Sequence, residues 1–191
     1  GKTRAAIASI TTNRVLIVVP VAVVAQWQAE IQLLCPKTSV NVYHGHGRKI
    51  DPSAHITITT IGVLGNEWKR STGSTSKKRV RPNALTVWRG ALSVDWSEVI
   101  IDESQKLSHS KRRSGELKRL YAYAFDRLRR TPFVLLLSGT IFKSSSADVA
   151  SALWMMNSKT SRSTLAEMKA ELDTVSDVVS AEEVGGMPEE H

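Results

Sequence analysis

Short runs of consecutive β-branched and apolar residues are the feature that most constrains how this chain can fold. Five of them occur along the chain, at Val15–Val19, Ile56–Thr60, 99–101, 133–137 and, more weakly, 40–43. A run that is apolar at successive positions predicts a strand buried on both faces, which is typical of a parallel sheet between layers of helices. Stretches with helical spacing of their apolar residues alternate with these runs, at 3–10, 21–34, 111–128 and 145–156. The alternation predicts an α/β domain whose parallel sheet carries helices on both faces.

Two stretches fall outside this alternation. Residues 69–82 contain six Lys and Arg among Ser, Thr and Gly, a composition that cannot bury itself, so we expect a solvated basic loop inserted in the fold. Residues 164–179 have a weak amphipathic pattern and precede a segment rich in Glu, Gly and Pro, which predicts one helix and a frayed end. We therefore divide the chain into a lobe at 1–157 and an acidic helical or disordered tail at 158–191.

The charge is distributed unevenly between these two parts. Residues 1–157 contain 23 Lys and Arg against 10 Asp and Glu, a net charge of +13, whereas residues 158–191 contain 3 against 8, a net charge of −5. A strongly basic lobe attracts polyanions, so nucleic acid is the first partner to consider and an anionic membrane surface the second.

Composition excludes several classes of protein. No apolar run approaches the roughly 20 residues of a membrane-spanning helix. Cys35 is the only cysteine, so the chain can form neither an internal disulfide nor a multi-cysteine zinc cage. The chain begins at Gly1 without a basic and apolar leader, and we expect an internal piece of a longer intracellular protein. Three tryptophans are expected in the core, namely Trp88, Trp96 and Trp154.

Gly1, Lys2 and Thr3 lead directly into a helical stretch, and this is the second half of a phosphate-binding loop pattern. In that pattern backbone N–H groups at a helix N-terminus cradle phosphates, the lysine reaches the β- and γ-phosphates, and the threonine hydroxyl binds Mg²⁺. The tripeptide is short, so an exposed N-terminal lysine without a ligand is an equally open interpretation.

Two of the predicted strands end in polar residues. Asp102 and Glu103 follow the strand at 99–101, and Ser138, Gly139 and Thr140 follow the strand at 133–137. Open α/β sheets bind ligands at the carboxyl ends of their strands, and in nucleotide hydrolases an acid at this position holds Mg²⁺ while its neighbour orients the attacking water. The alternatives are that Asp102 caps a following helix and that an ordinary turn follows residue 137.

In their order along the chain, these motifs resemble those of helicase superfamily two, and most closely the first RecA-like lobe of Swi/Snf-type ATP-dependent DNA translocases. The principal matching segments are 1–3, 16–20 with 26–27, 58–60, 101–105 and 137–140. Shorter matches at 43–45 and 95–96, and the helical stretch at 148–156, extend the resemblance over about residues 1–157. The resemblance implies a RecA-like parallel sheet flanked by helices.

The resemblance also implies the roles of individual residues. Nucleotide binding is implied for Gly1, Lys2 and Thr3, and Mg²⁺ binding for Thr3 and Asp102. A part in hydrolysis is implied for Asp102, Glu103 and Gln105. Residues implied to lie along the nucleic-acid path, or to couple hydrolysis to movement, are Pro20, Gln26, Trp27, Thr59, Thr60, Ser138, Gly139 and Thr140.

The function implied by the resemblance is ATP hydrolysis, with Mg²⁺, that drives movement along duplex DNA and remodels protein–DNA complexes such as nucleosomes. It implies a second RecA-like lobe outside this chain, so we expect the 191-residue chain alone to be inactive as an ATPase. It also implies a nuclear location in a eukaryote, or an intracellular one otherwise, without a membrane.

The chain departs from the family pattern after the two acids and after Thr140. Ser104 and Gln105 stand where the family usually has Ala-His, residues 108–109 replace a usual Lys-Asn, and Ile141 replaces a usual proline. A catalytically degenerate lobe that binds DNA or a protein is therefore the first alternative function, and a phosphate-binding-loop kinase or small-molecule ATPase is the second. The retained lysine and acids favour the ATPase, and the basic lobe disfavours the kinase.

Overall fold

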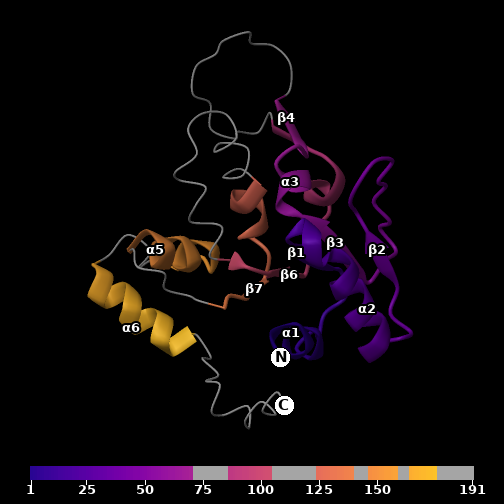
Figure 1. Cartoon of the computed structure of the whole chain (residues 1–191). Helices are drawn as coiled ribbons and strands as arrows, with labels where there is room; N and C mark the ends of the chain where they lie inside the picture. Colours follow the sequence, from indigo (N-terminus) through magenta and orange to yellow (C-terminus); the bar gives the residue numbers. More distant parts are fainter. Residues whose placement is uncertain (71–85, 105–123, 140–145, 159–163, 176–191) are drawn as a thin grey trace, which may run out of the picture.

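The computed structural model describes residues 1–70, 86–104, 124–139, 146–158 and 164–175 (Figure 1). A five-stranded sheet in the order β2-β3-β1-β6-β7 forms the centre, and its neighbouring strands are parallel. The strands are β1 (Val15–Val19), β2 (Val40–Val42), β3 (Ile56–Thr60), β6 (Glu98–Ile101) and β7 (Phe133–Leu136). All five predicted strands are confirmed, and their observed ends differ from the predicted ones by a residue at most.

β1 lies in the middle of the sheet and is buried at every position. Its odd-numbered residues belong to a hydrophobic cluster with Trp27 and Ile31, and its even-numbered residues belong to a second cluster with Leu92 and Phe125. Because successive side chains of a strand point to opposite faces, each face of the sheet has a core of its own. The predicted α/β architecture, with helices on both faces, is therefore confirmed.

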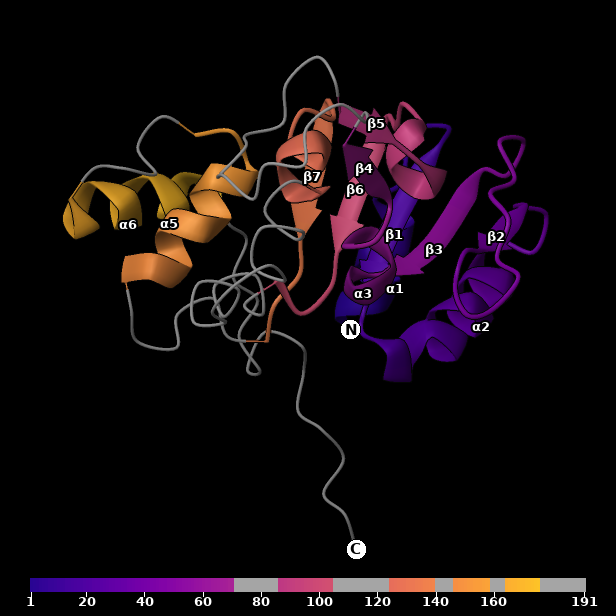
Figure 2. The same cartoon turned by 90° about the horizontal axis from the view of Figure 1, so that it is seen from above.

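The helices are α1 (Lys2–Ala8), α2 (Val24–Leu34), α3 (Ile61–Leu64), α5 (Ser146–Met155) and α6 (Leu165–Val175), with 3-10 turns η1 (Val21–Val23) and η2 (Gly90–Ser93). α1 and α2 contribute to the first cluster, and α3, η2 and α5 contribute to the second. Figure 2 shows α5 and α6 beyond the β7 side of the sheet and α2 on the β2 side. Within the part of the chain that the structure describes, no helix is both long and apolar enough to cross a membrane.

Three of the four helices predicted in the lobe are confirmed. The stretch at 21–34 opens with the 3-10 turn η1 and continues as α2. Of the helix predicted at 111–128, residues 124–128 are helical and the rest lies outside the described residues. Trp96 is buried, and Trp88 and Trp154 are partly buried against the same cluster, so their predicted place in the core is confirmed.

The tail begins with a helix that packs on the lobe. Met168 and Leu172 of α6 are buried in one cluster with Val149 and Leu153 of α5. The Ser158 hydroxyl donates a hydrogen bond to Glu171 Oε2 over 2.8 Å. The predicted tail helix at 164–179 is therefore present over Leu165–Val175, and residues 176–191 lie outside the described part. The division of the chain at residue 157 stays a prediction, although α5 and α6 share a core across it.

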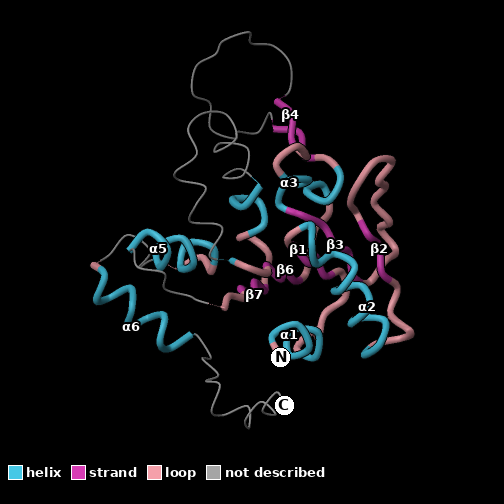
Figure 3. The backbone as a smooth tube through the Cα atoms, in the orientation of Figure 1, coloured by secondary structure: helices cyan, strands magenta, loops and turns pink. Residues whose placement is uncertain are grey.

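The predicted basic loop at 69–82 is wrong at its start. Lys69 and Arg70 lie in β4 (Trp68–Arg70), which pairs in antiparallel fashion with β5 (Thr86–Trp88) and places Trp68 opposite Trp88. Figures 1 and 3 show this two-stranded ribbon at the far end of the lobe from α1. The pairing joins two segments that are 16 or more residues apart in sequence, so a local count of charges does not detect it. Residues 71–82 lie outside the described residues.

Candidate nucleotide site

The sheet brings several predicted site residues together at the carboxyl-terminal ends of its strands. We call this end of the sheet, where β1, β3, β6 and β7 finish, the carboxyl edge. The Asp102 N–H, just after β6, donates to the Val18 carbonyl of β1 over 2.9 Å. The Leu137 N–H donates to the Ile101 carbonyl over 2.8 Å, and the Ser104 N–H donates back to the Leu137 carbonyl over 2.9 Å. The segments that follow β6 and β7 are therefore hydrogen-bonded to each other, and the acids lie beside the turn that begins with Ser138.

Lys2 reaches the same edge from the other end of the chain. It is the first residue of α1, and a Cβ atom built on Gly139 would lie 3.4 Å from Lys2 Nζ. The ammonium group therefore rests against the backbone of the turn after β7. Gly1 precedes α1 as its N-cap residue and makes no side-chain cap hydrogen bond. Two motifs predicted to bind one nucleotide thus meet in space.

The Asp102 carboxylate has a donor on each oxygen. Oδ1 accepts from the Glu103 N–H over 2.9 Å, and Oδ2 accepts from Trp27 Nε1 over 3.0 Å in a buried contact. The residue is 9% exposed. A carboxylate offers about four lone-pair sites, so two donors orient the group and leave acceptor capacity for a cation.

Glu103 has an unusual backbone conformation. Its φ angle is +52°, in the left-handed region that costs a residue other than glycine roughly 1 to 2 kcal/mol. Such backbone strain clusters at functional sites, where the surrounding structure maintains it. Here the strained residue follows Asp102 directly and donates the N–H that orients it.

Three side chains expected along a nucleic-acid path are buried and bonded inside the protein. Trp27 is 1%, Thr59 0% and Thr60 2% exposed. The Thr59 hydroxyl donates to the Tyr43 carbonyl over 3.0 Å, and the Thr60 hydroxyl accepts from the Val63 N–H at the start of α3. Their predicted place along a nucleic-acid path stays a prediction, and because the three side chains are buried, they themselves offer almost no surface to a ligand.

The other expected residues divide into accessible and undescribed ones. Gln26 and Gly139 are exposed, whereas Pro20 and Ser138 are half-buried, and their contact with nucleic acid stays a prediction. Gln105 and Thr140 lie outside the described residues.

Comparison with known proteins shows the family. A model of the SNF2-related domain matches residues 2–168. The chain belongs to the SNF2-related domain family. The Swi/Snf-type resemblance of the motifs is thereby confirmed, and the sheet described above is the RecA-like α/β fold of that family.

Individual relatives of this SNF2-related domain are distant. It is 26% identical over 102 residues to the DNA repair protein RAD5A of Arabidopsis thaliana, and this aligned region covers 50% of this chain and 9% of the plant protein. The structure of the Sulfolobus solfataricus SWI2/SNF2 ATPase core in complex with dsDNA matches with a TM-score of 0.55 at 19% identity, and the match covers 95% of this chain and 33% of that one. The Sulfolobus solfataricus SWI2/SNF2 ATPase core domain has a TM-score of 0.45 at 21% identity, covering 90% and 30%. The chain thus spans less than a tenth of the plant relative and a third of the first structure.

Sequence reasoning missed one group of contacting residues in this SNF2-related domain. The group comprises Tyr43, Arg48, Glu67 and Gly90, and we call it the Glu67 cluster. Glu67 is 5% exposed, and Arg48 Nη2 lies 3.2 Å from its Oε1. The guanidinium group also lies 5.6 Å from the Tyr43 ring centroid. Burial, together with a hydrogen bond to Glu67, raises the pKa of the Tyr43 hydroxyl. The cluster joins the segment after β2, the segment between α3 and β4, and the start of η2, and no periodicity or local motif links these residues.

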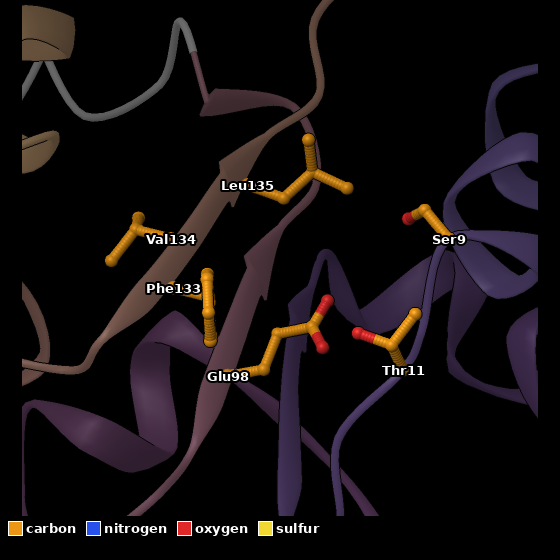
Figure 4. A pocket seen from close by; sticks show the side chains of 6 residues that line it. All are labelled: Ser9, Thr11, Glu98, Phe133, Val134 and Leu135. Carbon is orange, nitrogen blue, oxygen red and sulfur yellow. The ribbon is translucent and has the colours of Figure 1, made fainter.

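A small cavity lies at the opposite end of the strands, where β6 and β7 begin (Figure 4). Its volume is about 230 Å³, and its lining residues are Ser9, Thr11, Glu98, Phe133, Val134 and Leu135. Glu98 begins β6 and accepts a hydrogen bond from the Thr12 hydroxyl over 3.0 Å. Because Asp102 follows the other end of the same strand, this cavity is separate from the candidate nucleotide site.

The residues at the carboxyl edge fit a Mg²⁺ ion that is bound together with a nucleotide. Across the described ranges, no three His, Cys, Asp or Glu side chains are grouped to hold a metal by themselves. Mg²⁺ is usually held by one or two carboxylates together with substrate phosphates rather than by a protein cage. Asp102, with acceptor capacity left on both oxygens, fits such a site, and the predicted part of the half-buried Thr3 in it stays a prediction.

Proposed function

We propose that this chain is the ATP-binding lobe of a DNA-dependent ATPase that translocates on duplex DNA and remodels protein–DNA complexes. The observation that carries the proposal is the meeting of Lys2 with the turn at Gly139, beside the hydrogen-bonded segment that bears Asp102 and Glu103. A cationic group and two acids at the carboxyl edge of a parallel sheet are the elements that phosphoryl transfer requires.

In this proposal each group has a separate task. The Lys2 ammonium binds the β- and γ-phosphates, with the N–H groups of the first turn of α1 beside it. Asp102 and the Thr3 hydroxyl hold Mg²⁺, which when bound neutralises phosphate charge. Glu103 orients the attacking water, as the acid beside the metal-binding Asp does in nucleotide hydrolases. Ser138 and Gly139, which follow the Leu137 carbonyl that accepts from the Ser104 N–H, respond to the state of the nucleotide.

The partner we propose is duplex DNA bound through its phosphates. Support comes from family membership and from the net charge of +13 over residues 1–157, which favours a polyanion without selecting a base sequence. A second RecA-like lobe, protein–DNA complexes such as nucleosomes, and a nuclear location in a eukaryote belong to the same proposal. The nuclear location agrees with the description of the plant relative as a DNA repair protein.

The departure at position 104 is compatible with hydrolysis. Ser104 is tied to Leu137 through its backbone N–H, and this link is the same for serine and alanine. The link between the ends of β6 and β7 therefore survives the substitution of the family's usual residue.

The test is DNA-stimulated ATP turnover by the complete natural polypeptide. Lys2→Ala and Glu103→Gln should each lower turnover about 100-fold or more, because lost positioning and electrostatic contacts raise the barrier by several kcal/mol. Lys37→Ala and Asp173→Asn, at exposed positions away from this edge, are matched controls and should change turnover less than twofold. Less than a twofold effect for both site variants would contradict the proposal. A wild-type protein that binds DNA without turning over ATP would establish the degenerate binding lobe instead.

A further inference from the structure

The indole of Trp27 connects two layers of the fold at the candidate site. Trp27 belongs to α2 and packs in the cluster that contains the odd-numbered residues of β1. Its Nε1 donates to Asp102 Oδ2 over 3.0 Å, across 75 residues of sequence. Because the indole is 1% exposed, water does not replace this donor.

A second buried tryptophan shows what a purely structural indole does here. Trp96 is 7% exposed, and its Nε1 donates to the backbone carbonyl of Ala91 over 2.6 Å. A backbone carbonyl satisfies a buried indole N–H completely. Trp27 instead donates to a carboxylate, and hydrogen bonds to ionised groups are roughly twice as strong as those between neutral groups.

The two donors to Asp102 act on different oxygens and come from different parts of the chain. The Glu103 N–H holds Oδ1 and the indole holds Oδ2, so rotation of the carboxylate about its Cβ–Cγ bond would break both contacts. The local donor follows Asp102 in sequence, whereas the indole is supplied by α2. The orientation of the carboxylate therefore depends on the position of α2.

We propose that Trp27 is a positioning residue, whose indole N–H fixes the Asp102 carboxylate in the orientation that holds Mg²⁺ with the nucleotide. The role rests on the proposed function, since Asp102 requires a set orientation only if it holds the metal. Trp27 itself is 1% exposed, so it acts on the metal only through Asp102.

The test compares Trp27→Phe with Trp96→Phe in the complete natural polypeptide. Both variants remove a buried indole and its hydrogen bond, but only the first removes a donor from Asp102. The readout is equilibrium binding of a fluorescent, non-hydrolysable ATP analogue as Mg²⁺ is titrated. We expect Trp27→Phe to raise the Mg²⁺ concentration for half-maximal binding at least fivefold, and Trp96→Phe to change it less than twofold.

A second measurement on the wild-type protein does not depend on how well a variant folds. The indole Nε1–H resonance of Trp27 should shift when Mg²⁺ and the analogue are added together, whereas the Trp96 resonance should stay in place. Equal Mg²⁺ dependence in the two variants, or an unchanged Trp27 resonance in the loaded protein, would overturn the positioning role. Wild-type protein that binds the analogue with Mg²⁺ but never hydrolyses ATP contradicts the proposed function alone, and the Mg²⁺ titration then still decides the role of Trp27.

Discussion

Replacing Gly90 with alanine should strongly destabilise the fold through the Glu67 cluster. Gly90 has a φ angle of +48°, and a Cβ atom there would overlap Glu67 Oε2 and the Tyr43 hydroxyl and lie 2.8 Å from Glu67 Cδ. The left-handed conformation alone costs an alanine roughly 1 to 2 kcal/mol. Displacing the buried Glu67 carboxylate from its partners adds the cost of an unsatisfied buried group, about 1 to 3 kcal/mol.

We therefore expect Gly90→Ala to lower the free energy of unfolding by about 2 to 5 kcal/mol. Urea denaturation followed by circular dichroism, with an unchanged m-value, measures this quantity. Gly62→Ala is the matched control, because Gly62 is exposed in α3 and a Cβ atom there meets nothing within 4 Å. Alanine is favoured over glycine inside a helix by about 0.5 to 1 kcal/mol, so the control should be neutral or stabilising.

Glu67→Ala provides an independent check on the origin of the loss. It removes the carboxylate that the new methyl group would meet, so Gly90→Ala should cost less in the Glu67→Ala background than in the wild type. Strictly additive effects of the two changes, or a loss below about 1 kcal/mol for Gly90→Ala, would refute the steric argument.

Three further predictions concern the tail, DNA binding and turnover. Hydrogen bonds from the Thr164 N–H and hydroxyl lower the pKa of Glu167. The stability that Glu167 contributes to α6 should therefore be complete above its unfolded pKa of about 4.3, and it should decline as the pH falls through the lower folded pKa. The free energies of unfolding of the wild type and of Glu167→Gln, measured as a function of pH, should therefore converge in acid. Duplex DNA affinity of the complete polypeptide should fall roughly 100-fold for a threefold rise in salt if about 5 phosphates are neutralised, with little preference over shuffled sequence; a salt-independent isotherm would contradict a backbone-tracking lobe. With saturating duplex DNA, the 191-residue chain alone should turn over ATP at less than about 1 s⁻¹. In related phosphoryl transfers, arginines supplied across a cleft raise the rate by a factor of about 10³ to 10⁵. Faster turnover in a steady-state assay would contradict the need for a second lobe.

The strands and the order of the site motifs could be predicted because their causes are local. A run such as Val15–Val19 is apolar at successive positions, and only a strand covered on both faces buries all of it. The same reasoning placed Asp102 and Ser138 after strands, and parallel pairing then brought them to one edge. The sheet could therefore be predicted correctly from these short-range patterns.

Other features depend on partners that are distant in sequence. The ribbon of β4 and β5 pairs Trp68 with Trp88, across a stretch whose composition predicted a loop. α3 is only four residues long, too short for a periodic pattern to indicate, and its start depends on the hydroxyl of Thr60.

Trp27 shows most clearly where sequence reasoning ended. Its motif and its place in the order of motifs were evident from the sequence, and family resemblance assigned it to a path for nucleic acid. Burial and the bond to Asp102 were decided only when α2 packed on the sheet, because a side chain's partner is set by whatever lies across the core. The sequence by itself determined the chemical identity of each residue and the local periodicity, because both depend only on residues that are neighbours along the chain. The orientation of the Asp102 carboxylate, and the packing of Glu67 against Gly90, arise from contacts between segments tens of residues apart, and only the tertiary structure decided them.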